Sequence, residues 1–298
     1  MIGVFITTVR LGGKNDNSYI TAYQDKVQIL KLSPSPRLIL VGGSNTAFSF
    51  DSEILHKKLP FHPINLGLSM SIPLEIWFHV LRRFADAGDL VIFSLEDSLY
   101  RSSLSAESLP TLYQVILLDP SLISAVPPLL RRFPWRSVFD QGLSVFHGFI
   151  HRGYQLMKGE VRNHHDFMKR SYFNQYGDLV PPAELTVKYV RHEPNPPLSH
   201  EEISSQILQL SHFTKELRKK GINSGFAFPP TYPGYPRQEK EILRSLREAE
   251  LTIFLSPEQS RYPEEAFLDV VYHLNSDYRP QHTEKLAKAI SERASNLE

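Results

Sequence analysis

Short apolar runs recur along this chain between longer amphipathic segments, and this alternation restricts the possible folds more than any other feature. Residues 38–41 (LILV) and 89–95 (DLVIFSL) show the pattern, each followed by glycine or acidic residues. Such runs, rich in Val, Ile and Leu, are typical of strands buried on both faces of a parallel sheet. The pattern predicts five strands, over residues 38–41, 63–67, 89–95, 223–228 and 251–255.

Amphipathic segments between these runs predict helices that connect the strands. Apolar side chains recur at helical spacing over residues 73–87, and Asp51 is a suitable N-cap for a short helix over residues 52–58. Further helices are predicted over residues 200–220, 237–249 and 281–293. Strands that alternate with helices form a parallel sheet covered on both faces. We therefore expect an α/β fold: a three-layer α/β/α domain with a five-stranded parallel sheet.

The alternation stops at about residue 104 and resumes after about residue 175. This stretch is helix-like, aromatic and interrupted by prolines, so we expect a helical insertion in a domain that spans residues 31–298. Residues 1–30 are expected to form a separate N-terminal segment. The segment begins MIGVFITTV, which fits either an edge strand or the end of an export or anchor region.

Charge and cysteine content exclude several classes of function. The chain has 33 Lys and Arg against 32 Asp and Glu, so no strong overall field favours nucleic acid or an anionic membrane. The absence of cysteine excludes disulfides, thiolate catalysis and cysteine-based zinc sites. His164, His165 and Asp166 resemble a metal-binding fragment, but adjacent histidines on a helix point in different directions. We expect no metal and no organic cofactor.

A serine follows the first predicted strand directly after two glycines. Gly42 and Gly43 permit a sharp turn, which would place the Ser44 hydroxyl at the carboxyl edge of the sheet. A hydroxyl needs a base within hydrogen-bonding distance, and His273 in the last loop is the candidate. Asp269 would orient the imidazole, with Glu265 as the alternative acid. A turn serine, a packed histidine and a phosphate-binding glycine loop stay open as other interpretations, although the loop lacks the Lys-Ser/Thr ending of a nucleotide site.

These residues resemble the conserved blocks of SGNH (GDSL-like) hydrolases. The sequence Gly42-Gly43-Ser44-Asn45 is similar to the first block, with Gly43 where the family usually has Asp. Asn65-Leu66-Gly67 looks like the second block, and residues 269–273 look like the last. The resemblance implies a flavodoxin-like sheet, Ser44 as nucleophile, His273 as base and backbone N–H groups of Ser44 and Gly67 as oxyanion donors.

Further motifs resemble the SGNH-like proteins of bacterial exopolysaccharide and cell-wall acylation loci. They are Phe50-Asp51-Ser52, residues 172–178, Pro229-Pro230 and Tyr272-His273-Leu274-Asn275 followed by Thr283. Besides Gly43, three positions depart from the family pattern, and one of them is Pro280, which stands near where a turn glycine would be expected. The third block normally supplies an Asn side chain to the oxyanion hole, whereas this chain has Glu96, and Asn45 is the candidate replacement donor. Asp269 precedes His273 by four residues rather than three.

The resemblance implies ester hydrolysis or acetyl transfer on a carbohydrate or polysaccharide, with no nucleic acid as partner. The alternative is a catalytically silent scaffold or carbohydrate-binding subunit of a polysaccharide assembly system, which the Glu96 departure favours. A nucleotide-binding domain is a third interpretation. The family also implies a periplasmic or other extracytoplasmic location, an N-terminal membrane tether and polysaccharide-assembly partners, with a cytoplasmic location as the alternative.

Overall fold

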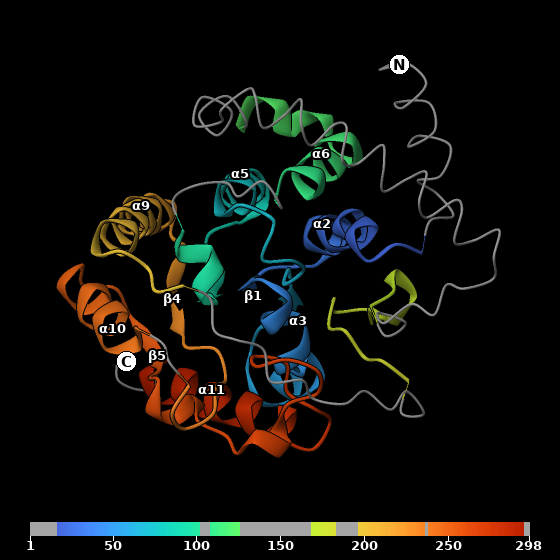
Figure 1. The fold of residues 1–298 in the computed structure, drawn as a ribbon. Coiled ribbons are helices and arrows are strands. Elements are labelled where there is room, and N and C mark those ends of the chain that lie inside the picture. Colours follow the sequence, from blue (N-terminus) through green and yellow to red (C-terminus); the bar gives the residue numbers. More distant parts are fainter. Residues whose placement is uncertain (1–16, 102–107, 126–167, 183–195, 236–237, 295–298) are drawn as a thin grey trace, which may run out of the picture.

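The computed structural model describes residues 17–101, 108–125, 168–182, 196–235 and 238–294 (Figure 1). Its centre is a sheet of five parallel strands in the order β2-β1-β3-β4-β5. The strands are β1 (Arg37–Gly42), β2 (His62–Asn65), β3 (Leu90–Ser94), β4 (Asn223–Ala227) and β5 (Ile253–Leu255). Each lies within two residues of a predicted run at both ends, so the α/β fold with a five-stranded parallel sheet is confirmed.

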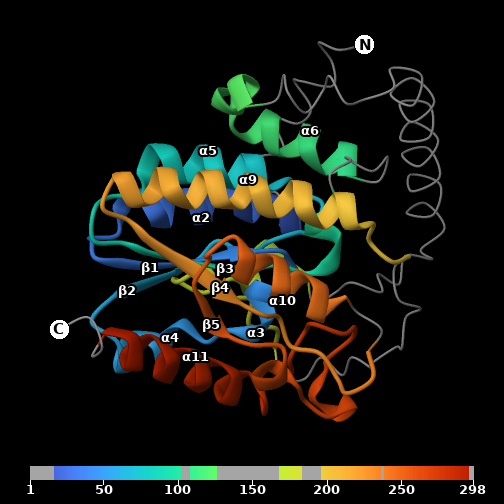
Figure 2. The same cartoon turned by 90° about the vertical axis from the view of Figure 1, so that its left-hand side faces the viewer.

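The sheet is covered by helices on both faces, as its two fully buried strands, β1 and β3, require. Successive side chains of a strand point to opposite faces, and in β1 Ile39 and Val41 belong to one apolar cluster while Leu38 and Leu40 belong to the other. Figure 2 shows helices above the sheet and below it. Those above include α2 (Ala22–Leu32), α5 (Leu74–Phe84) and α9 (His200–Lys219), and those below include α4 (Ser52–Lys58) and α11 (Arg279–Ala294). The three-layer arrangement is thus confirmed.

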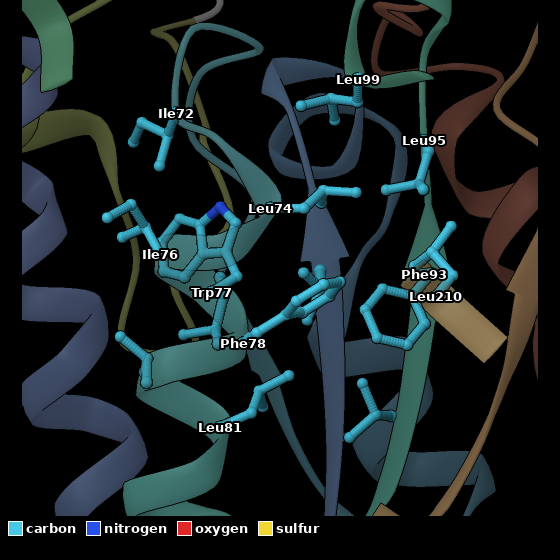
Figure 3. Packing of buried hydrophobic residues seen from close by; sticks show 14 of the residues in the cluster. Ile72, Leu74, Ile76, Trp77, Phe78, Leu81, Phe93, Leu95, Leu99 and Leu210 are labelled. Atoms are coloured by element: carbon cyan, nitrogen blue, oxygen red, sulfur yellow. The ribbon is translucent and has the colours of Figure 1, made fainter. Parts of the chain in front are cut away.

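Aromatic side chains fill the larger of the two clusters (Figure 3). Trp77 and Phe78 of α5 are almost completely buried, and Phe78 stacks on Phe213 of α9 with ring centroids 4.0 Å apart. Phe93 of β3 packs edge-on against Phe78 at 6.3 Å. Each such side chain contributes about 1.5–3 kcal/mol by leaving water. This packing fixes the positions of α5 and α9 over the sheet.

The helix ends follow local capping chemistry. Asp51 caps α4 as predicted, because its carboxylate accepts from the backbone N–H groups of Glu53 (3.0 Å) and Ile54 (3.2 Å). At the start of α9, Ser199 and Glu202 form a reciprocal capping box. A further helix, α10 (Glu239–Glu248), lies within the predicted range 237–249. It contributes Ile242 and Leu246 to the larger cluster.

Two short segments of the predicted insertion can be placed. They are α6 (Ser108–Leu118) with the 3-10 turn η3 (Pro120–Ala125), and the 3-10 turn η4 (Arg170–Tyr172). The His164-His165-Asp166 fragment and the apolar stretch at residues 1–9 lie outside the described residues. Within the described ranges, none of the helices has both the length and the apolar character that a membrane span needs.

The strand order places a reversal of the connections at the end of β1. The chain passes from β1 to β2 on one side and then to β3 on the other, so the connections leave in opposite directions beside the carboxyl end of β1. Ligands of open parallel sheets bind at such a reversal. The segments that follow β1, β2 and β3 carry Ser44, Gly67 and Glu96 to this edge.

Candidate functional site

Ser44 begins the short helix α3 (Ser44–Ser49), directly after β1 and two glycines. Neither glycine has room for a side chain. A Cβ on Gly42 would lie 2.1 Å from the carbonyl oxygen of Ser94, and one on Gly43 would lie 1.8 Å from Oε1 of Glu96. The turn therefore packs tightly against the end of β3, and Ser44 is left partly exposed at the carboxyl edge.

Ser44, His273 and Asp269 form a continuous hydrogen-bonded triad. Oγ of Ser44 lies 2.8 Å from Nε2 of His273, and Nδ1 of His273 lies 2.7 Å from Oδ1 of Asp269. An ionised carboxylate only accepts hydrogen bonds, so the network assigns the imidazole proton to Nδ1 and leaves Nε2 to accept from the serine hydroxyl. This is the arrangement that general-base activation of a serine requires.

The imidazole is held from several directions. Its ring stacks on Phe48 of α3 with centroids 4.1 Å apart, and the side chain is only 5 % exposed. The preceding residue, Tyr272, has a φ of 84°, a left-handed conformation that is unusual for a bulky side chain. Ser49 Oγ donates to the Tyr272 carbonyl at 2.7 Å, and the Tyr272 phenol donates to Asp97 at 3.0 Å. These contacts hold a strained backbone conformation next to the base. Such strain is often found at functional sites.

The longer spacing between acid and base does not prevent their contact. The loop closes through Leu268 N–H donating to the His273 carbonyl at 2.8 Å, with the left-handed Tyr272 inside the turn. This closure brings Asp269 back to the imidazole four residues later in the sequence. Glu265, the alternative acid, is exposed, and its backbone carbonyl accepts from Asn275 at 2.8 Å. Asp269 is the residue that the structure places against the base.

The Asn-Leu-Gly motif has a different position from the one expected of an oxyanion donor. The Gly67 N–H donates to the Asn65 side-chain oxygen at 2.9 Å, which commits it to its own loop. The Asn65 amide donates to the Thr46 carbonyl at 2.9 Å and to Asp178 at 2.8 Å. A Cβ on Gly67 would lie 2.5 Å from Thr46 Cβ. In this arrangement the motif packs the loop after β2 onto α3, and it does not present a donor to the substrate.

A backbone amide further along this loop lies beside the nucleophile turn. The Met70 nitrogen lies 3.2 Å from the position that a Cβ on Gly43 would occupy, on the side where Glu96 also packs. The Ile72 N–H donates to the Ser69 carbonyl at 3.0 Å, so Met70 is the second residue of a tight turn. Met70 could not be predicted from the sequence, because a backbone N–H group leaves no signature in side-chain type.

Asn45 and Glu96 also differ from simple oxyanion donors. The Asn45 amide is buried and donates to the Ser94 carbonyl (3.0 Å) and hydroxyl (3.2 Å), so it ties α3 to β3. Glu96 is 4 % exposed, and its carboxyl group fills the space into which a side chain at position 43 would extend. Two of the departures from the family pattern, Gly43 and Glu96, are therefore sterically linked.

Tyr19, in the turn η1 (Tyr19–Thr21), reaches the same edge from the start of the described chain. Its hydroxyl donates to the Leu68 carbonyl, two residues before Met70. Burial raises the pKa of the phenol well above its usual value, and the nearby charges of Glu96 and Asp269 raise it further. The phenol is therefore neutral and remains a hydrogen-bond donor.

A buried lysine joins the first helix to the loops behind the site. Lys26 of α2 is 1 % exposed, and its ammonium donates to the carbonyls of Asn65 (2.9 Å) and Gly177. Burial lowers the pKa of Lys26 to about 7, while Asp178 and Asp25 oppose the shift. Residues 22–32 thus pack into the same core as the sheet.

The buried carboxylate of Asp178 connects four parts of the chain. Its carboxylate accepts from the Ser52 N–H (2.8 Å) and hydroxyl (2.7 Å), from the Asn65 amide (2.8 Å) and from Asn174 (3.2 Å). Arg279 of α11 lies 3.4 Å away as its ion-pair partner. A fully buried carboxylate with this many donors holds α4, β2 and α11 together beneath the site.

Replacing Asp178 by alanine is expected to lower the free energy of unfolding by about 3–5 kcal/mol, because several buried donors lose their acceptor together. Urea denaturation of the purified protein measures this change. Asp277→Ala removes an exposed carboxylate from the loop before α11 and serves as the control, with an expected change below about 0.5 kcal/mol. Equal unfolding midpoints for the two variants would show that the Asp178 carboxylate does not stabilise the fold.

The described residues contain no group of three or more His, Asp or Glu side chains arranged to bind a metal ion. No protein-family model, curated protein or solved structure matches this chain.

Proposed function

We propose that this protein catalyses serine-dependent ester hydrolysis or acyl transfer, with Ser44 as nucleophile and His273 as base. The observation that carries the proposal is the triad, in which 2.8 Å separates Ser44 Oγ from Nε2 of His273 and 2.7 Å separates Nδ1 from Asp269. The serine and the histidine are 229 residues apart in sequence, and they meet at the edge where reactive groups of parallel sheets gather.

The reaction has two steps. Ser44 Oγ attacks the ester carbonyl while His273 Nε2 takes the hydroxyl proton, and collapse of the tetrahedral intermediate breaks the bond to the alcohol, which receives that proton. Water or a sugar hydroxyl then attacks the acyl-enzyme, with His273 again as base, and Ser44 is regenerated. Asp269 stabilises the imidazolium in both steps. Hydrolysis and transfer differ only in the acceptor.

The developing oxyanion needs hydrogen-bond donors beside Ser44. We assign this role to the backbone N–H groups of Ser44 and Met70, in place of Gly67, whose N–H is committed to Asn65. Met70 qualifies because its nitrogen lies against Gly43, the residue that precedes the nucleophile. Preorganised backbone donors of this kind are usually the largest single contribution to acyl-transfer catalysis.

A carbohydrate ester is the substrate class that the resemblance to SGNH-like proteins of polysaccharide acylation supports. The same resemblance supports an acetyl group, an extracytoplasmic location with an N-terminal tether, and polysaccharide-assembly proteins as partners. The second candidate function is a silent scaffold or carbohydrate-binding subunit. One observation favours it: Glu96, an acidic residue, packs against Gly43 where the family places a neutral donor.

Turnover of p-nitrophenyl acetate and release of acetate from acetylated oligosaccharides distinguish the two functions. The enzyme is expected to exceed the uncatalysed rate with both substrates. A scaffold would bind the oligosaccharide in calorimetry but release no acetate from it.

A further inference from the structure

Tyr19 is not part of the triad, yet it contacts the segments on either side of it. Its ring packs against the cluster formed by Ala47, Phe48 and Leu179, and Phe48 is the residue that stacks on the imidazole of His273. Its hydroxyl donates to the carbonyl of Leu68 in the loop that carries Met70. One side chain thereby links the helix after the nucleophile to the loop with the proposed oxyanion donor.

The segment that carries Tyr19 is itself anchored to a distant part of the chain. Ser18 pairs with Lys169 in an antiparallel bridge, and the Arg170 N–H donates to the Asn17 carbonyl at 3.1 Å. The Tyr19 ring lies 5.3 Å from that of Phe173. Residues 17–19 and 168–173 thus pack together beside α3. This packing fixes the direction from which the Tyr19 phenol approaches the loop.

The 68–70 loop leads to an exposed turn. Met70 is 47 % exposed, and its turn is closed by the backbone bond from Ile72 to Ser69. An oxyanion donor is effective only when it is held within a few tenths of an ångström of its working position, since misplacement by about 1 Å can cost 10²-fold in rate. The bond to the Leu68 carbonyl restrains the loop immediately before this turn.

We infer that Tyr19 is a positioning residue of the site, whose hydroxyl holds the 68–70 loop so that the Met70 N–H faces the nucleophile turn. The inference rests on the proposed acyl-transfer function. It means that the segment carrying Tyr19, at the start of the described chain, contributes to the rate of reaction. It also gives the neutral phenol a role in catalysis that involves no proton transfer, because the hydroxyl bonds to a backbone carbonyl.

Tyr19→Phe tests this inference, because it removes the hydroxyl and keeps the ring against Phe173. We expect kcat for p-nitrophenyl acetate to fall about tenfold per titrated active site, with KM within about twofold of wild type and little change in melting temperature. Tyr23→Phe is the matched control. Tyr23 belongs to the helix that follows and is buried, and its hydroxyl contacts Asp119 at 3.4 Å, so loss of this hydroxyl should leave kcat unchanged.

A double-mutant cycle separates positioning from a general loss of stability. If Tyr19 acts through the Met70 amide, adding Tyr19→Phe to Met70→Pro causes no further loss of kcat, whereas independent effects would multiply. Wild-type kcat in Tyr19→Phe, or a tenfold loss that persists in the double variant, would overturn the inference while leaving the triad intact. A wild-type protein without turnover would instead remove the proposed function itself.

Discussion

Ser44→Ala is expected to reduce kcat/KM for p-nitrophenyl acetate by about 10⁴–10⁶-fold, and His273→Ala by a similar factor. The nucleophile and its base act as one unit, so removing either abolishes the same step and the two losses do not multiply. The double variant should therefore be no slower than the single variants. Initial rates of p-nitrophenolate release, followed by absorbance, would compare all three variants with buffer alone.

Two substitutions outside the triad serve as controls for these variants. Ser276→Ala removes an exposed hydroxyl three residues after the base, and His200→Ala removes an exposed imidazole at the start of α9. The Ser276 hydroxyl donates to Asp277 and the His200 imidazole pairs with Glu241, so both variants should retain wild-type kcat/KM. Loss of activity in the controls, or full activity in Ser44→Ala, would mean that the measured hydrolysis does not depend on this serine.

Met70→Pro is expected to lower kcat by about 10²–10³-fold, the usual cost of losing one oxyanion donor. Proline has no N–H, and the second position of the 69–72 turn is one where proline is well tolerated. Met70→Ala keeps the N–H and removes the side chain, whose sulfur accepts from Ser98 at 3.1 Å. The alanine variant should therefore remain close to wild type.

The comparison between these two variants isolates the backbone amide. Steady-state kinetics should show the loss in kcat with a small change in KM, since the donor contributes mainly in the transition state. Circular dichroism and thermal melting would establish that Met70→Pro is folded. If the proline and alanine variants have the same kcat, Met70 is not an oxyanion donor and the proposed geometry of the site is wrong on that point.

The fold could be predicted from the sequence because its strands are short and mostly apolar, and because amphipathic helices separate them. The alternation in β1 that buries Ile39 on one face and Leu40 on the other is a direct consequence of this pattern. The short helix α3 was not predicted. Its sequence, SNTAFS, contains residues of low helix propensity, and tertiary contacts such as the Asn45 bond to Ser94 hold it in place.

Only part of the site could be predicted from the sequence. Ser44, His273 and Asp269 have side chains with recognisable chemistry in a recognisable order, and the structure brings them together. The Met70 amide and the Tyr19 hydroxyl depend on how loops from different parts of the chain meet. Asn65 and Gly67 resembled oxyanion residues in sequence, but their polar groups bond to the loop itself and to Asp178.

The most direct test of the account is reaction of the folded protein with a fluorophosphonate, followed by intact-mass measurement and peptide mapping. An activated serine is phosphonylated at its oxygen with loss of fluoride, so we expect one adduct per chain, located on Ser44, and none in Ser44→Ala. A wild-type protein that stays unlabelled, or an adduct that persists in Ser44→Ala, would contradict the claim that His273 and Asp269 activate this hydroxyl.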